Sequence, residues 1–414
     1  MDCQFDDWIF LALVALLPVI QPVAVRIGRY PVPPADFVFI GLALAFAATV
    51  LAGRRRVRWT PWCWTLVAYA AALAASAATS EDPRRSLLKL AGEWYLVGLA
   101  FLTFNYVDSA RALRRTLVAW SVGTAITIAA SAAGIALFLG GVRGASNIFL
   151  YTYGSLPPGP YPRVMALFLN ANTLCTYVVA SVMLLLAARA SGWIGRRTAD
   201  VLIVGTMTTA VFSLSPGLGG LSLAVGVWWW NALRERSPRL GALCLVGGLA
   251  GAAVFFVAIT VSPVSLADLA PSSRVLAWRD TWHTFTAHPW LGRGLGLEVA
   301  AVRYRNASGA FEFLTDAHNT WLSILAQDGM VGLAAFVAVV LPIARRMRLS
   351  AVLDDLGNPA AMVRLGVELA FLGGFLYQTL SGSFENTRHV WALVGLTAAV
   401  QEPIWRRPVV TASP

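Results

Sequence analysis

Apolar residues occur in long runs along this chain, and short polar connections separate one run from the next. Crossing a bilayer takes about 20 apolar residues, with a range near 17 to 25. Twelve runs reach or approach that length, near 8–25, 36–52, 62–79, 87–107, 117–139, 167–188, 199–214, 217–233, 240–261, 319–344, 366–382 and 389–404. The pattern predicts an all-α polytopic membrane protein with about twelve transmembrane helices in a single domain, residues 1–414.

Two polar segments, 140–166 and 262–318, are too long to be simple connections. The first is rich in Gly, Pro and Tyr, which favours an ordered loop or lid over a regular helix. In the second, apolar residues recur at spacings of 3, 4 and 3: Val275, Trp278, Trp282 and Phe285. We therefore expect an amphipathic helix between the ninth and tenth spans, lying on the membrane or covering a cavity.

The composition agrees with a chain whose main solvent is lipid. Hydrophobic residues make up 57% of the 414 residues and charged residues 13%, against roughly a quarter charged in soluble domains. The four cysteines lack the paired spacing of a disulfide framework or a zinc site, so we expect neither a disulfide nor a metal.

The basic residues indicate how the chain crosses the membrane. They comprise 31 Arg and one Lys, give a formal net charge of +11, and fall mostly in the short connections. This placement follows topology and does not form a nucleic-acid-binding surface. With the N-terminus inside, 19 basic residues face the cytoplasm and 13 face the outer compartment. We expect both termini to be cytoplasmic and both long polar segments to be periplasmic.

The basic residues on the outer side are not explained by the positive-inside rule, so we consider a chemical explanation for them. Among them are Lys89, Arg143, Arg163, Arg274, Arg279, Arg293, Arg303, Arg305 and Arg388. A diphosphate group would need such cations, because guanidinium groups bind phosphate oxygens through paired hydrogen bonds. Pairing with outer carboxylates or with lipid phosphates is the competing explanation.

Two arginines and the single lysine are distinguished by their positions. Arg274 and Arg279 would lie roughly 140° apart on one helix, so only one can contact a given phosphate. Arg274 is favoured, because backbone donors at a helix start also point at an anion. For Arg279, contact with lipid phosphate is the alternative. Lys89 lies at the outer mouth of the fourth span, where it either contacts phosphate or pairs with Glu93 four residues later.

A histidine marks the entrance to the tenth span. Asp316 is predicted to cap that helix, with Asn319 at its third position, which leaves His318 without a structural role. An imidazole that titrates near neutral pH, beside cations that lower its pKa, suits general-base work on a sugar hydroxyl. His318 is therefore the predicted catalytic residue.

Polar amides follow the candidate charged residues at the starts of two spans. Asn170 and Asn172 lie in the sixth span, and Asn319 lies in the tenth. Amides there either form hydrogen bonds between helices or line a substrate cavity. Arg388, directly before the twelfth span, is open to the same two interpretations.

The remaining polar features have simpler explanations. Gly292, Gly294 and Gly296 lack the spacing of a nucleotide-binding loop, and we expect them to allow the backbone to approach a ligand or another helix. Asp328 and Glu368 fall within predicted spans, so they must face protein or a cavity.

Three elements, taken together, resemble the O-antigen ligase and polymerase family. Residues 163–174, RVMALFLNANTL, are similar to its Arg-x-x-Gly-x-Phe-x-Asn-Pro-Asn-x-Leu element. Arg274 and Trp278, followed by HPWLGRGLG at 288–296, resemble its second element. The third corresponds to AHNTWL at 317–322 with DGMVG at 328–332. Ala166 and Ala171 stand where the family usually has Gly and Pro.

The resemblance implies a fold like that of the GT-C glycosyltransferases and a metal-independent, inverting reaction without a cofactor. The donor would be a glycan on undecaprenyl diphosphate and the acceptor a sugar hydroxyl of the lipid A-core oligosaccharide, at the periplasmic face of a bacterial inner membrane. Carried over by motif, Arg163 and Arg274 would hold the diphosphate, and His318 would activate the acceptor hydroxyl.

Two other functions compete with that of a ligase. A polymerase of the same family would use another lipid-linked repeat as its acceptor. A transporter of lipid-linked sugars belongs to a different class, and it would place charges along a path through the membrane, whereas here they gather at one mouth. Besides donor, acceptor and membrane lipids, no partner is expected, and no nucleic acid.

Overall fold

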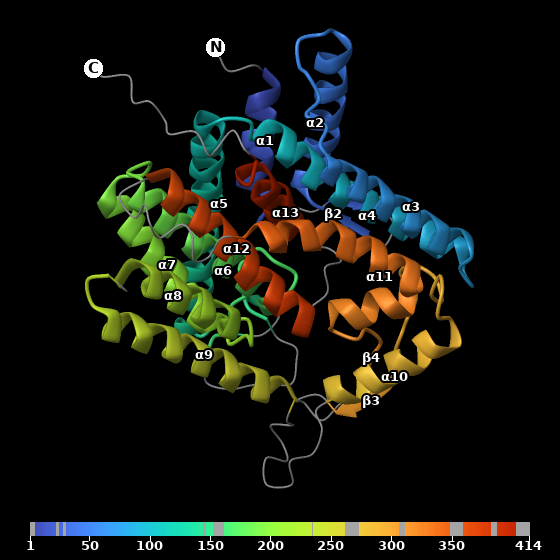
Figure 1. Cartoon of the computed structure of the whole chain (residues 1–414). Coiled ribbons are helices and arrows are strands. Elements are labelled where there is room, and N and C mark those ends of the chain that lie inside the picture. The colour runs from blue at the N-terminus through green and yellow to red at the C-terminus, as the bar shows by residue number, and fades with distance from the viewer. Residues whose placement is uncertain are drawn as a thin grey trace.

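The computed structural model describes residues 5–21, 25–27, 30–143, 146–151, 161–233, 235–260, 273–305, 311–347, 359–381 and 387–402. Within these ranges the chain is almost entirely helical (Figure 1). In the part of the chain that the structure describes, eight helices are long and apolar enough to cross a membrane. This supports the predicted all-α polytopic membrane protein.

Helices occupy each of the twelve predicted apolar runs, and one more lies in the second long polar segment. Their bounds are α1 Phe5–Leu16, α2 Pro34–Leu51, α3 Pro61–Ala78, α4 Pro83–Tyr106, α5 Ala110–Leu139, α6 Ala171–Ala190, α7 Arg196–Ser213, α8 Leu218–Leu233, α9 Pro238–Thr260, α10 Ser273–Ala287, α11 Thr320–Arg346, α12 Pro359–Ser381 and α13 Arg388–Val400. The helix predicted in the second polar segment is α10. In the first, 140–166, the described part holds no helix beyond the end of α5.

The first span was predicted too long. A helix over 8–25 was expected, but α1 ends at Leu16, and β1 (Val25–Ile27) pairs antiparallel with β2 (Tyr30–Val32). Pro18 and Pro22 explain the difference, because proline removes a helical hydrogen bond and clashes with the preceding turn. A second antiparallel hairpin joins β3 (Val302–Arg305) to β4 (Phe311–Leu314) in the second long polar segment.

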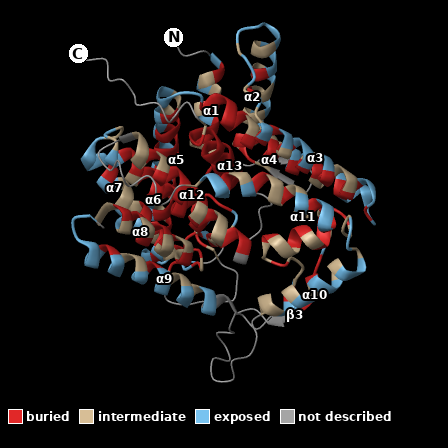
Figure 2. Cartoon of the chain, in the orientation of Figure 1, coloured by how far each residue is buried: buried red, intermediate tan, exposed pale blue. Residues whose placement is uncertain are grey.

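The core is built around α6, whose residues are buried along most of its length. It packs against α12, α7 and α5, while α13 packs against α4. Figure 2 shows this buried centre in red, with α9 exposed at the edge of the molecule. Exposed apolar residues such as Leu243, Val246 and Val254 on α9 are what a lipid-facing helix carries.

The loop between α10 and β3 packs so closely against α11, and against the α3–α4 connection, that side chains are excluded. Gly292 has φ 72°, and a Cβ there would lie 2.2 Å from the carbonyl group of Gln327. Gly294 has φ 131°, and its Cβ would lie 2.0 Å from Oγ of Ser80. Close approach to a helix, one of the two interpretations of these glycines, is confirmed for Gly292, whereas Gly294 approaches the α3–α4 connection.

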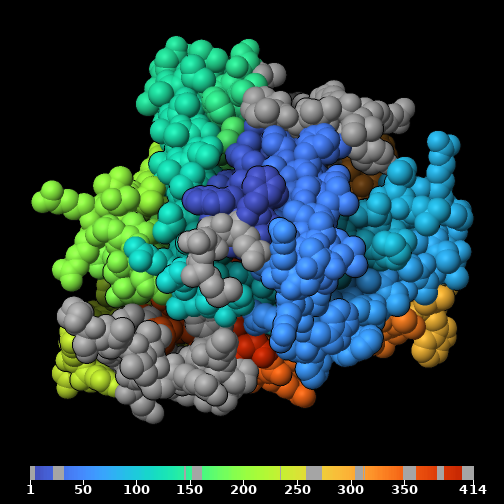
Figure 3. Space-filling view, turned by 90° about the horizontal axis from the view of Figure 1, so that it is seen from above, coloured from blue at the N-terminus to red at the C-terminus, as the bar shows by residue number. Residues whose placement is uncertain are grey.

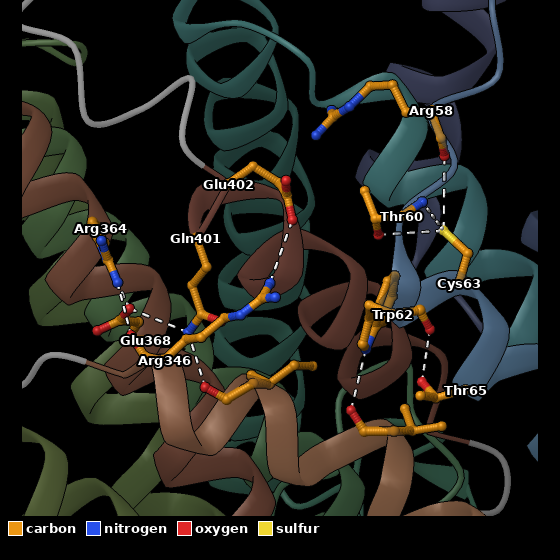
Figure 4. A network of polar contacts seen from close by, with 12 residues as sticks. Arg58, Thr60, Trp62, Cys63, Thr65, Arg346, Arg364, Glu368, Gln401 and Glu402 are labelled. Carbon is orange, nitrogen blue, oxygen red and sulfur yellow. Dashed lines mark hydrogen bonds and ion pairs between the residues drawn. The ribbon is translucent and has the colours of Figure 1, made fainter.

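Arginines beside two connections that were predicted to be cytoplasmic, α2–α3 and α11–α12, lie in one polar region (Figure 4). Arg364 pairs with the fully buried Glu368 at 2.9 Å, and Arg346 lies 3.4 Å from Glu402. Gln401 donates to the carbonyl oxygen of Ile343 and to Glu368.

The two acidic residues predicted to face protein or a cavity are both buried. Glu368 is 0% exposed and Asp328 is 3% exposed. That prediction is confirmed.

Candidate functional site

His318 lies in a sharp turn directly before α11. Its φ of 46° is in the left-handed region, which is uncommon for a side-chain-bearing residue. The His318 backbone N–H donates to Oδ1 of Asp316 at 3.2 Å, and the imidazole Nδ1 lies 3.8 Å from Oδ2 of the same carboxylate. The imidazole therefore has an acidic partner two residues away.

The prediction that Asp316 caps the helix was wrong. Asn319 is the N-cap, and its Oδ1 accepts from the backbone N–H groups of Trp321 and Leu322. The left-handed turn at His318 places the helix start three residues later than expected. Oδ1 of Asp316 accepts instead from the hydroxyl of Ser323, at 3.0 Å.

The surroundings of His318 favour its neutral form. Burial lowers the pKa of the imidazole, and the nearby Arg274 lowers it further, while Asp316 acts in the opposite direction. The side chain nevertheless remains 37% exposed. A neutral imidazole that is open to approach can accept a proton near pH 7.

Helix α10 is fixed to the turn that carries His318. The indole Nε1 of Trp278 donates to the carbonyl oxygen of Ala317 at 2.9 Å. Trp278 and Phe285 pack against a cluster of Val299, Ala317 and Ala326. Of the predicted apolar face, Trp282 is the exception at 49% exposed.

This docking explains how Arg274 comes close to His318. Arg274 is four residues before Trp278, so the two side chains lie on the same side of α10. The residue before α10, Ser272, which was predicted to help form the helix start, lies outside the described residues.

Arg163 is held by groups from several elements. Its Nε donates to the carbonyl oxygen of Ser213 at 3.2 Å, and its Nη2 lies 3.5 Å from Oδ1 of Asn172. The guanidinium carbon lies 5.0 Å from the centre of the Tyr151 ring. Burial lowers the pKa of Arg163 from its usual range, and repulsion from Arg274 acts in the same direction. A cation with so little access to water is well suited to bind an anion.

The structure thus brings Arg274 into electrostatic range of both Arg163 and His318. Arg163 lies before α6, Arg274 in α10 and His318 before α11. The charge of Arg274 lowers the pKa of both Arg163 and His318. Tyr377 in α12 also interacts with Arg163. The catalytic and diphosphate-binding roles themselves stay predictions.

The three predicted amides differ in what they contact. Asn172 accepts from Arg163 and, at 3.0 Å, from the hydroxyl of Ser215. Asn170 caps α6, where its Oδ1 accepts from the backbone N–H of Thr173 at 2.7 Å. The third, Asn319, caps α11. A cavity-lining role for each of these amides remains a prediction.

The other predicted cations contact different groups. Lys89 pairs with Glu93 at 3.1 Å, and its side-chain stem lies against Gly296. Arg388 forms a two-pronged ion pair with Asp36, at 2.7 and 2.8 Å.

The structural alternative for Lys89, an ion pair four residues apart, is thus present, and Arg388 likewise has a carboxylate partner. Arg279 is exposed on α10. Their contribution to phosphate binding stays a prediction.

Two residues of this site were not predicted. Asp316 was interpreted as a helix cap, although an acid two residues from a candidate general base was itself a signal. Tyr377 lies in an apolar run, and no sequence pattern distinguished it from a core residue. Among the described residues, no group of three or more His, Cys, Asp or Glu could hold a metal ion.

Comparisons with known proteins match the part of the chain that holds most of this site. Residues 176–337 match the protein-family model described as O-antigen ligase, a range that includes Arg274 and His318. An O-antigen ligase from Pseudomonas aeruginosa is 28% identical over 140 residues, which cover 34% of this chain. That alignment spans 32% of the length of the Pseudomonas protein.

Proposed function

We propose that the chain, whose residues 176–337 match the O-antigen ligase family model, is a glycosyltransferase of lipopolysaccharide biosynthesis. It transfers a glycan from undecaprenyl diphosphate to a sugar hydroxyl of the lipid A-core oligosaccharide. The observation that carries this proposal is the approach of Arg163, Arg274 and His318 from three separate segments, where one arginine influences both of the other groups.

In this proposal the two arginines bind the leaving group. The bond between the anomeric carbon and the diphosphate oxygen breaks, and the electron pair leaves with the undecaprenyl diphosphate. Arg163 and Arg274 stabilise the charge that develops on this oxygen. Preorganised guanidinium groups in a site with little water can supply such stabilisation without a metal.

His318 acts on the acceptor. Its neutral imidazole takes the proton of the acceptor hydroxyl as the hydroxyl oxygen forms its bond to the anomeric carbon. Attack in line with the departing oxygen inverts that carbon. Asp316 faces Nδ1, so it positions the ring and stabilises the imidazolium that forms, with the other nitrogen, Nε2, available to the acceptor.

The proposed setting is a bacterial inner membrane crossed twelve times, with cytoplasmic termini and a periplasmic active site. The arginine-bearing connections of Figure 4 support one cytoplasmic end. The opposite end of α3 is near the candidate site. Ser76, close to the C-terminus of α3, donates to the carbonyl oxygen of Gln327, which lies in the same helix, α11, that His318 precedes. Membrane lipids would surround the exposed apolar faces.

The test uses purified full-length protein in detergent with a lipid-linked glycan and lipid A-core acceptor. We expect a covalent product with the wild type, with or without EDTA. Arg274→Ala and His318→Ala should each lower the rate by about 10²-fold or more, while thermal unfolding stays cooperative. Arg197→Ala is the matched control, because it removes the same charge from an exposed position at the start of α7 that is not among the candidate site residues.

Each alternative gives a different product. Glycan joined to another lipid-linked repeat identifies a polymerase, and the absence of any covalent product with folded wild-type protein leaves transport. Near wild-type transfer by both Arg274→Ala and His318→Ala would refute the site assignment.

A further inference from the structure

A cavity of about 810 Å³ lies among α1, the α2–α3 connection and the α4–α5 connection. Six arginines line it: Arg54, Arg55, Arg56, Arg58, Arg111 and Arg115. The acidic lining residues are Asp7 and Asp108, so the lining carries an excess of positive charge. Figure 3 looks onto this side of the molecule, with α1 in dark blue at its centre, α2 in blue beside it and α5 in teal.

This cavity is separate from the site around His318. Arg58 precedes the N-terminus of α3, whereas Ser76 and Ser80, near its C-terminus, approach α11 and the α10–β3 loop. A helix of 18 residues is about 27 Å long. The two sites therefore lie at opposite ends of α3, and the catalytic proposal makes no use of the arginine-lined cavity.

Two of the six arginines form a fixed wall. Arg55 pairs with Asp6 and Asp7, and its guanidinium lies over the ring of Tyr106 at 4.2 Å. Arg58 donates to the carbonyl oxygens of Phe104 and Val107, at 2.9 Å each. These contacts hold α1, the α2–α3 connection and the end of α4 together.

The other four arginines have no such anchor. Among the described residues, no carboxylate lies within ion-pair distance of Arg54, Arg56, Arg111 or Arg115. Like charges that share one hollow repel one another, so their arrangement favours an anionic occupant. The first turn of α5 also lines the cavity, and the N-terminus of a helix attracts negative charge.

We propose that this cavity binds a phosphate group, presented by the headgroup of an anionic phospholipid or by a free phosphate-containing anion. Guanidinium groups suit phosphate because each can donate two parallel hydrogen bonds to its oxygens. Phe10 and Leu11 also line the cavity, and their apolar side chains offer a surface for the less polar part of a lipid headgroup.

The test compares two double variants of equal charge change. Arg56→Gln with Arg111→Gln removes two cavity arginines that are exposed and hold no part of the fold together. Arg196→Gln with Arg197→Gln removes two exposed arginines at the start of α7, which also belong to a predicted cytoplasmic cluster but do not line the cavity. Full-length protein in neutral detergent is heated with phosphatidylglycerol, with phosphatidylcholine, or with inorganic phosphate against chloride at equal ionic strength.

A saturable rise in melting temperature is expected with phosphatidylglycerol or inorganic phosphate, and not with phosphatidylcholine. The cavity variant should need at least tenfold more of the anion for the same rise, while the α7 variant should behave as wild type. Saturation by phosphatidylglycerol alone identifies a lipid site, and saturation by inorganic phosphate identifies a site for the free anion. No saturable rise with either, or equal weakening in both double variants, would overturn the proposal, since the arginines would then act only through general surface charge.

Discussion

Replacing Asp316 by Asn tests whether this carboxylate works through His318. An Asn oxygen can still accept from the His318 backbone N–H and from the Ser323 hydroxyl, so the turn should be kept. What the variant loses is the negative charge 3.8 Å from Nδ1 of the imidazole. Asp316→Asn is therefore close to a pure change of charge.

The expected magnitude follows from that distance. Two unit charges about 4 Å apart attract by about 1 kcal/mol in water and by about 4 kcal/mol at an effective dielectric constant of 20. The side chains of His318 and Asp316 are 37% and 38% exposed, so the lower figure applies. A change of about 1 kcal/mol corresponds to about a fivefold change in an equilibrium or a rate.

The sign follows from which form of His318 is active. The neutral imidazole is the base, so transfer slows as the pH falls through the pKa of His318, which burial and Arg274 already hold below the usual value for histidine. Asp316 raises that pKa, so its neutralisation should move the acidic limb of the rate profile to lower pH. The half-maximal rate should then be reached at a proton concentration about fivefold higher than in the wild type. Because the imidazolium formed during transfer also loses support, the plateau rate should fall by about fivefold.

The assay is the pH dependence of kcat/KM for transfer, measured from pH 5 to pH 8. Ser323→Ala is the control, since it removes a hydroxyl from Asp316 but leaves the charge, and its acidic limb should coincide with that of the wild type. The reasoning is refuted when Asp316→Asn retains both the wild-type limb and the wild-type plateau.

Substitutions at three further positions test the packing that holds the site. Gly294→Ala should lower the melting temperature strongly, because its Cβ would overlap Oγ of Ser80 at a φ of 131°; differential scanning fluorimetry in detergent measures it, and an unchanged value contradicts the close packing. Trp278→Phe keeps an aromatic ring but loses part of the indole and its N–H donor to Ala317, so it should cost at least about 1 kcal/mol in stability and slow transfer. An unchanged rate would separate this contact from catalysis. At Ala166, with φ 51°, Gly should stay within about 1 kcal/mol of wild type, because relief of strain offsets the lost methyl group. Val at the same position should be clearly less stable, and equal melting temperatures for the two would contradict the left-handed backbone.

The positions of the helices were largely predictable because their signal is local. A run of apolar residues of sufficient length contains what a membrane helix requires, since its backbone hydrogen bonds are satisfied within the run. The failures lie where proline or capping intervenes. Pro18 ended α1 well before residue 25, and Asn170 moved the start of α6 to Ala171. Nothing in hydrophobicity alone records either effect.

At the entrance to α11, two good capping residues compete. Asp316 and Asn319 both have short acceptor side chains, and both lie where the apolar run begins. The left-handed φ of His318 decides between them, because it places a turn after Asp316 and delays the helix to Thr320. A turn fixed by tertiary contacts, such as the bond from Trp278 to Ala317, leaves little trace in the local sequence.

The same reasoning explains why family patterns locate the charged residues but not their partners. A carboxylate for Lys89 was visible four residues away, whereas the partner of Arg388 is Asp36, more than three hundred positions distant. Only the tertiary fold, which brings the start of α13 to the start of α2, places those two side chains together. Long-range ion pairs of this kind decide which outer cations remain available to a substrate.

Ala166 shows that a sequence departure can preserve a backbone constraint. Alanine stands where the resembling family usually has glycine, yet its φ of 51° is a conformation that glycine adopts at lowest cost. The backbone N–H groups of Met165 and Ala166 both donate to the carbonyl oxygen of Phe149, and that of Val164 donates to Phe212. These bonds fix the turn directly after Arg163. At position 166 the constraint is therefore on the direction of the backbone that carries Arg163. A residue as small as alanine is sufficient to maintain that direction.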